Sequence, residues 1–141
     1  MKKVYENISV GSDADCTFDK NKFVIHACKI CYLKSNPNNR YNYLTYRKGN
    51  HLFLNLVDIQ NLNPNFTTPI IREAIVFLKE NKGQEILIHC NKGESRAPSI
   101  ALLYFGLQER LSYNEALKQF KEIYHDYNPG KGITEYLKKH W

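Results

Sequence analysis

Residues 85–109 of the chain read EILIHCNKGESRAPSIALLYFGLQE. The first five residues are apolar enough to form a central strand of a sheet, and residues 97–109 form a nearly all-apolar helical segment that tolerates Pro98 in its first turn. A short loop joins them. Its backbone N–H groups and the N-terminus of the following helix converge on one point of positive potential. The stretch therefore predicts an anion-binding loop between a buried strand and a buried helix.

The side chains of this loop indicate the kind of anion and the chemistry. Gly93 lets the backbone turn tightly, Lys92 adds positive charge, and the guanidinium of Arg96 can hold two oxygens of one phosphate. Cys90 is a thiol near a helix N-terminus and a guanidinium, surroundings that favour its thiolate form. A thiolate beneath a bound phosphoryl group is suited to nucleophilic attack followed by hydrolysis.

The flanking segments alternate between strand and helix patterns. We expect strands at residues 23–29, 43–46 and 51–57, a helix from about Thr67-Thr68-Pro69 to Gly83, another from the capping box Ser112-x-x-Glu115 to about residue 125, and a last one over 133–140. This order predicts an α/β fold with a single central β-sheet flanked by helices. The phosphate-binding loop would lie between a central strand and a buried helix.

Composition sets the broad class of protein. With 141 residues, 43% of them hydrophobic, the chain matches one globular domain over residues 1–141. It has no apolar run long enough for a membrane span and no signal segment, and four irregularly spaced cysteines fit reduced thiols, so we expect a cytoplasmic protein. The net charge of +6 favours anionic partners.

The motif His89-Cys90-x-x-Gly93-x-x-Arg96 resembles the phosphate loop of the cysteine-dependent protein tyrosine phosphatases, and the short chain is similar to their dual-specificity branch. The resemblance covers about residues 5–138, including the segments 7–12, 23–29 and 128–133. It implies a phosphatase-like fold and hydrolysis of phosphotyrosine, phosphoserine and phosphothreonine in proteins through a cysteinyl-phosphate. It implies no metal and no other cofactor, and we expect a monomer.

The resemblance also suggests a role for each site residue. Cys90 would be the nucleophile, and Arg96 would hold the phosphate together with the loop residues Asn91, Lys92, Gly93, Glu94 and Ser95. His89 would support the shape of the loop. Expelling the leaving oxygen requires an acid. Asp58 is the aspartate that follows an apolar strand and opens a loop, 32 residues before Cys90, and this position is similar to that of the family's general acid.

Departures from the family pattern leave alternatives open. Ala97 stands where the family commonly has Ser or Thr, so we expect slower breakdown of the intermediate, or alternatively a module that binds phosphoproteins without hydrolysing them. Lys92 adds a cation that suits phosphoinositides or RNA 5′-phosphate ends. A rhodanese-like sulfurtransferase also uses a cysteine loop, but it would leave Asp58 without a role.

Two further patterns have ordinary structural interpretations. Cys28-x-x-Cys31, with His26 beside it, lacks a second pair at zinc-finger spacing, so we interpret residues 23–28 as an apolar strand in which cysteine packs as a small hydrophobe. Asn39-Arg40-Tyr41 resembles a tripeptide that walls the phosphotyrosine pocket of longer, tyrosine-specific phosphatases. The tyrosines and basic residues of segment 41–48 are interpreted as a solvated strand pair rather than a nucleic-acid surface.

Overall fold

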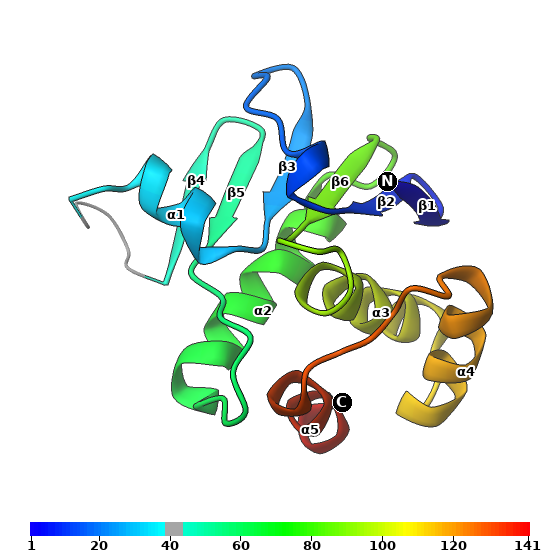
Figure 1. Ribbon diagram of the computed structural model, residues 1–141. Helices are drawn as coiled ribbons and strands as arrows, with labels where there is room; N and C mark the ends of the chain where they lie inside the picture. Colours follow the sequence, from blue (N-terminus) through cyan, green and yellow to red (C-terminus); the bar gives the residue numbers. More distant parts are fainter. Residues whose placement is uncertain (39–43) are drawn as a thin grey trace.

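Residues 1–38 and 44–141 are described by the computed structural model, and over these ranges the chain forms a six-stranded mixed sheet (Figure 1). The strands follow the order β1-β2-β6-β3-β5-β4 across the sheet. Their bounds are Lys2–Tyr5 (β1), Ile8–Gly11 (β2), Phe23–His26 (β3), Thr45–Lys48 (β4), His51–Leu54 (β5) and Ile86–His89 (β6). The four inner strands, β2, β6, β3 and β5, are parallel to one another, and the two edge strands are antiparallel to their neighbours.

Helices cover both faces of the sheet. Their bounds are Asp13–Asp15 (the 3₁₀ helix η1), Lys29–Ser35 (α1), Pro64–Glu80 (α2), Arg96–Glu109 (α3), Tyr113–Ile123 (α4) and Lys131–His140 (α5). Helices α2, α3, α4 and α5 gather on one side, and α1 lies apart from them against β4 and β5 (Figure 1). Helix α3 lies closest to the middle of the sheet, where it contacts β6 and β2.

Successive side chains of a strand point to opposite faces of the sheet, so the apolar residues form two clusters, one on each face. On β5, Leu52 and Leu54 belong to the large core beneath α2 and α3, whereas Phe53 packs with Tyr32 of α1 on the opposite face. Because parallel strands with both faces covered need apolar residues on both sides, β5 is buried along its whole length. The predicted α/β fold with one central sheet flanked by helices is confirmed.

Three histidines lie on the α1 face of the sheet. His26 stands between His89 and His51, with its Nδ1 2.8 Å from Nε2 of His89 and its Nε2 2.8 Å from Nδ1 of His51. His26 and His89 are cross-strand neighbours in the parallel register of β3 and β6. Burial, together with the two neighbouring rings, lowers the pKa of His26 to about 3, so this ring is neutral in the folded protein.

Several predicted boundaries were wrong. The expected strand 23–29 ends at His26, because Cys28 is the N-cap of helix α1, which the sequence pattern did not predict. Helix α2 begins at Pro64, earlier than expected, because the side chain of Asn63 caps it by accepting a hydrogen bond from the Asn65 N–H. The expected strand 51–57 ends at Leu54.

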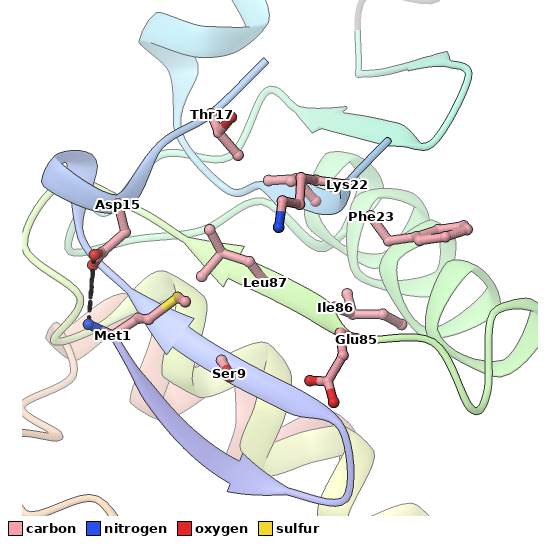
Figure 2. Close-up of a pocket in the computed structure, with 10 residues that line it drawn as sticks. Met1, Ser9, Asp15, Thr17, Lys22, Phe23, Glu85, Ile86 and Leu87 are labelled. Carbon is pink, nitrogen blue, oxygen red and sulfur yellow. Dashed lines mark hydrogen bonds and ion pairs between the residues drawn. The ribbon is translucent and has the colours of Figure 1, made fainter. Parts of the chain in front are cut away.

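The hypothesis for Asn39-Arg40-Tyr41, and the beginning of the strand expected at 43–46, lie outside the described residues. Elsewhere the α1 face of the sheet is partly open: Figure 2 shows a pocket where half-buried Leu87 of β6 and Ser9 of β2 lie beneath the segment that carries Asp15. An ion pair of 3.4 Å joins the Met1 amino group to Asp15 there. Within residues 1–38 and 44–141, none of the helices has the length and apolar character needed to cross a membrane.

Candidate active site

The loop after β6 lies at the carboxyl edge of the parallel strands, the edge at which open α/β sheets bind ligands. Register pairs His89, the last residue of β6, with Gly11 of β2 and His26 of β3. The pairing of β6 with the segment after β2 extends into the loop, because the Asp13 N–H donates a backbone hydrogen bond of 2.9 Å to the Asn91 carbonyl. The predicted position between a central strand and a buried helix is therefore confirmed.

Gly93 allows the loop to close. Its φ is +75°, in the left-handed region that L side chains rarely adopt, and a Cβ there would stand 3.0 Å from the carbonyl oxygen of Gly11. The hydroxyl of Tyr124, which follows α4, donates a hydrogen bond of 2.6 Å to the Gly93 carbonyl. Burial, together with nearby acidic groups, raises the pKa of Tyr124 to about 12, so this donor stays protonated at neutral pH.

Arg96 is the first residue of α3, so the loop leads directly into a helix N-terminus. Its Nη1 donates a hydrogen bond of 3.1 Å to the Leu56 carbonyl, in the segment between β5 and α2. This bond uses one N–H of the guanidinium and leaves the others for an anion. It also ties the loop to the segment that carries Asp58.

Asp58 lies against the C-terminal part of the chain. A Cβ at Gly130 would overlap Asp58 Oδ1, and a Cβ at Gly132 would overlap the Ile59 carbonyl oxygen. Both glycines belong to the N-terminal end of α5. The absence of side chains at these two positions lets the Asp58 loop approach α5 closely.

These segments enclose an open pocket of about 320 Å³. It brings together most of the predicted site residues with a C-terminal segment, and its lining comprises Asp58, Cys90, Asn91, Lys92, Glu94, Ser95, Arg96, Asn128, Pro129 and Gly130. Cys90 is buried, with 3% of its surface exposed, whereas Asp58 and Lys92 are exposed. The pocket therefore has a thiol that is largely shielded from solvent, and a carboxylate and an ammonium group at accessible positions.

Two hydrogen bonds attach the C-terminal segment to the loop. The Gly130 N–H donates to Ser95 Oγ at 2.9 Å, and the Asn128 N–H donates to the Glu94 carbonyl at 2.8 Å. The sequence patterns did not place this segment in the site, although its resemblance to the C-terminal segment of the family was a signal. Tyr124 was missed as well, because no local pattern connects it to a loop 31 residues earlier.

The remaining predicted residue, His89, is fully buried beside the loop rather than in the pocket. Its Nδ1 lies 3.5 Å from the Cys90 carbonyl oxygen, a long contact consistent with support of the loop. Ala97 is fully buried in the core. The Ser99 hydroxyl lies 2.7 Å from the Tyr127 hydroxyl, so it is engaged away from the loop.

Comparison with known proteins agrees with this geometry. No protein-family model matches the chain. The dual specificity protein phosphatase PHS1 of Arabidopsis thaliana is 34% identical over 70 residues, which are 48% of this chain and 8% of that protein. The structure of the human tyrosine phosphatase-like serine/threonine/tyrosine-interacting protein superimposes with a TM-score of 0.73 at 18% identity, covering 99% of this chain and 94% of that one.

The chain has the fold of the dual-specificity phosphatases. The structure of DUSP15 matches with a TM-score of 0.71 at 18% identity, over 99% of this chain and 85% of that one. PTPMT1, solved in complex with PI(5)P, matches with a TM-score of 0.67 at 17% identity, over 97% and 91% of the two chains. The predicted resemblance to the dual-specificity branch of the cysteine-dependent phosphatases is thus confirmed in fold and in a stretch of sequence.

Proposed function

We propose that the protein is a cysteine-dependent phosphatase that hydrolyses phosphotyrosine, and also phosphoserine and phosphothreonine, in proteins. The observation that carries this proposal is that Asp58, from the segment after β5, lines the same pocket as Cys90 and Arg96 of the loop after β6. A nucleophile, an anion clamp and an acid are the groups that phosphate ester cleavage requires.

The two steps of the reaction use the same residues. The Cys90 thiolate attacks phosphorus, the bond from phosphorus to the ester oxygen breaks, and Asp58 gives its proton to the leaving alcohol or phenol. Asp58, now a carboxylate, then takes a proton from water while the water oxygen attacks phosphorus and the S–P bond breaks. Inorganic phosphate leaves and the thiolate is restored. Arg96 and the loop N–H groups stabilise the phosphoryl oxygens in both steps.

The experiment that tests this mechanism is hydrolysis of para-nitrophenyl phosphate by the wild-type protein and by two variants. Cys90→Ser should abolish turnover, and Asp58→Asn should lower kcat about 10²- to 10⁴-fold, the usual contribution of a general acid. Cys28→Ser and Asp19→Asn are matched controls, because these residues lie outside the pocket, and both should keep wild-type activity. The proposal is refuted if Cys90→Ser hydrolyses para-nitrophenyl phosphate as fast as the wild-type protein does.

The intermediate can be observed directly. Ala97 provides no hydroxyl beside the thiol, so breakdown of the cysteinyl-phosphate should be the slower step, and rapid mixing should show a burst of para-nitrophenol that is absent in Cys90→Ser. If wild type binds vanadate or a phosphopeptide but shows neither burst nor turnover, the protein is a phosphate-binding module instead of an enzyme.

A second substrate class is supported by Lys92, which is exposed and lines the pocket. An added cation there would interact with a second phosphate group. Turnover of phosphopeptides should therefore be compared with that of phosphoinositides and of 5′-phosphorylated RNA. If the wild-type protein prefers phosphopeptides and Lys92→Ala keeps that preference, the substrate is protein. If the wild-type protein prefers a multiply phosphorylated substrate and turnover of that substrate falls in Lys92→Ala, the alternative is supported.

A further inference from the structure

A group of two cysteines and two histidines lies on the α1 face of the sheet, outside the pocket. Cys16 follows η1, His26 ends β3, Cys31 lies in α1 and His89 ends β6. One ligand atom from each residue lies within 4.8 Å of all the others. Cys31, His26 and His89 are buried, and Cys16 is half-buried at the edge of the group.

Three of the distances between these atoms are close to those of a tetrahedral metal site. The two Sγ atoms are 3.8 Å apart, Cys16 Sγ is 3.7 Å from His26 Nδ1, and Cys31 Sγ is 3.9 Å from His89 Nε2. A zinc ion at usual bond lengths separates tetrahedral ligands by about 3.8 Å for S–S, about 3.6 Å for S–N and about 3.3 Å for N–N. The two ring nitrogens, 2.8 Å apart, would have to separate by about half an ångström.

The positions of the ring protons leave a lone pair on His26 at the centre of the group. His51 Nε2 lies 2.7 Å from the Asp19 carbonyl, which can only accept, so this nitrogen carries the proton of the neutral ring. His51 Nδ1 then accepts from His26 Nε2, and His26 Nδ1 is left with a lone pair directed at His89. In the metal-free protein the His89 Nε2–H donates to this lone pair across 2.8 Å. With the proton on Nδ1 instead, beside the Cys90 carbonyl oxygen, His89 Nε2 carries the second lone pair that a metal ion needs.

We propose that Cys16, His26, Cys31 and His89 form a structural zinc site, distinct from the phosphate pocket. A cation at the centre of the group would replace the hydrogen bond between His89 and His26 with two metal–nitrogen bonds, with the His89 proton on Nδ1. Two thiols release their protons on binding, so two thiolates balance the charge of the divalent ion in a buried place. Four protein ligands at tetrahedral spacing leave no open position, as in structural rather than catalytic zinc sites.

The surroundings supply the outer contacts that metal-bound histidines need. The Asp19 carbonyl orients His51, His51 orients His26, and the Cys90 carbonyl lies beside Nδ1 of His89. The site would join the segment after η1 and helix α1 to the end of β6, directly before Cys90. Zinc would thus stabilise the base of the phosphate loop without contacting the reacting atoms.

Metal content of the purified 141-residue chain tests the site. Because Cys90 is another thiol that can bind soft metals, the measurements use the Cys90→Ser background. Reduced protein loaded with Zn²⁺ and passed through gel filtration should retain one zinc per chain, and Co²⁺ in its place should show the visible absorption of a tetrahedral, thiolate-ligated ion. Cys16→Ser and Cys31→Ser should lose both signals, whereas Cys28→Ser, a buried thiol on the same helix end, should keep them.

Two further variants guard against failure to fold. Cys16→His replaces one zinc ligand with another at the half-buried position, so it should retain zinc where Cys16→Ser does not. His51→Gln should weaken zinc affinity about 10- to 100-fold, the usual cost of losing an outer-shell partner. The proposal is overturned if the reduced chain retains no zinc, if Cys16→Ser and Cys31→Ser bind as much as Cys28→Ser does, or if alkylation and mass spectrometry find Cys16 joined to Cys31 as a disulfide in freshly isolated protein.

Discussion

The Tyr124 hydroxyl donates a hydrogen bond of 2.6 Å to the carbonyl oxygen of Gly93, the residue at which the phosphate loop turns. The contact is buried and joins the end of α4 to the loop across 31 residues of sequence. A loop that must direct its N–H groups at one anion depends on carbonyls that point away from it. Tyr124 therefore holds the loop in the shape that we propose binds phosphate.

We expect Tyr124→Phe to destabilise the fold by about 1–3 kcal/mol, because it leaves the Gly93 carbonyl buried without this donor. It should also weaken phosphate and vanadate inhibition. Urea unfolding and inhibition constants measure the two effects. Tyr136→Phe is the control, since it removes a hydroxyl 2.7 Å from that of Thr68, far from the loop in the sequence and outside the pocket lining. Equal inhibition constants in all three proteins would show that Tyr124 has no part in binding.

Gly130→Ala should lower kcat by up to about 100-fold, because displacement of an acid by about 1 Å has costs of that order. Gly130 has a φ of −65°, which alanine adopts readily, so the new methyl group acts through its overlap with Asp58 Oδ1. Steady-state kinetics and thermal unfolding separate the effects.

Gly83→Ala provides the opposite case. Gly83 has a φ of +95°, and among the described residues no atom beyond its chain neighbours lies within 4 Å of the place a methyl group would take. Alanine there should therefore reduce stability through the backbone alone and leave kcat unchanged. If Gly130→Ala retains the kcat of the wild-type protein, catalysis does not depend on the position of Asp58 beside Gly130.

Arg96→Lys keeps the positive charge and removes the planar fork. We expect kcat to fall about 10²- to 10³-fold, because lysine cannot hold two phosphoryl oxygens in a fixed geometry. The bond to the Leu56 carbonyl would also be lost or altered. Measuring the vanadate inhibition constant together with kcat shows whether the substitution weakens anion binding as well as turnover. Lys121→Arg, on the exposed side of α4, should change neither.

The capping box of α4 predicts a pH effect on stability. Hydrogen bonds from the backbone and side chain of Ser112 lower the pKa of Glu115 below its ordinary 4.5. Its contribution to stability is therefore present above pH 4.5 and is lost as pH falls through the lowered pKa of the folded state. Glu115→Gln, which can still accept from Ser112, should unfold at a lower temperature than wild type at about pH 6, and this difference should shrink as the pH is lowered to about 3.

Glu122→Gln, in the same helix but away from its N-terminus, should match wild type at both values. An equal difference between wild type and Glu115→Gln at both pH values would mean that the charge of Glu115 does not stabilise the helix end.

Local sequence was enough to predict the phosphate loop. The strand, the loop and helix α3 are consecutive in the chain, so their order and the spacing from Cys90 to Arg96 are enough to predict the proposed anion site. Asp58 could be predicted from its place after an apolar strand, and the structure puts it in the same pocket. The shorter elements were harder. Helix α1 has 7 residues, too few for a helical period to emerge from the sequence around Cys28.

The sequence by itself determined the α/β class, the loop and its candidate acid, because each depends on neighbours along the chain. Tertiary structure alone decided which distant groups meet. Gly130 lies against Asp58 because α5 packs on the loop before α2, and Tyr124 reaches Gly93 because α4 ends beside it. His26 faces His89 because β3 and β6 are parallel neighbours in register, and this pairing brings Cys16 and Cys31 to the same point. Spacing along the chain does not encode such contacts, since strand order and register are set by burial of the whole sheet.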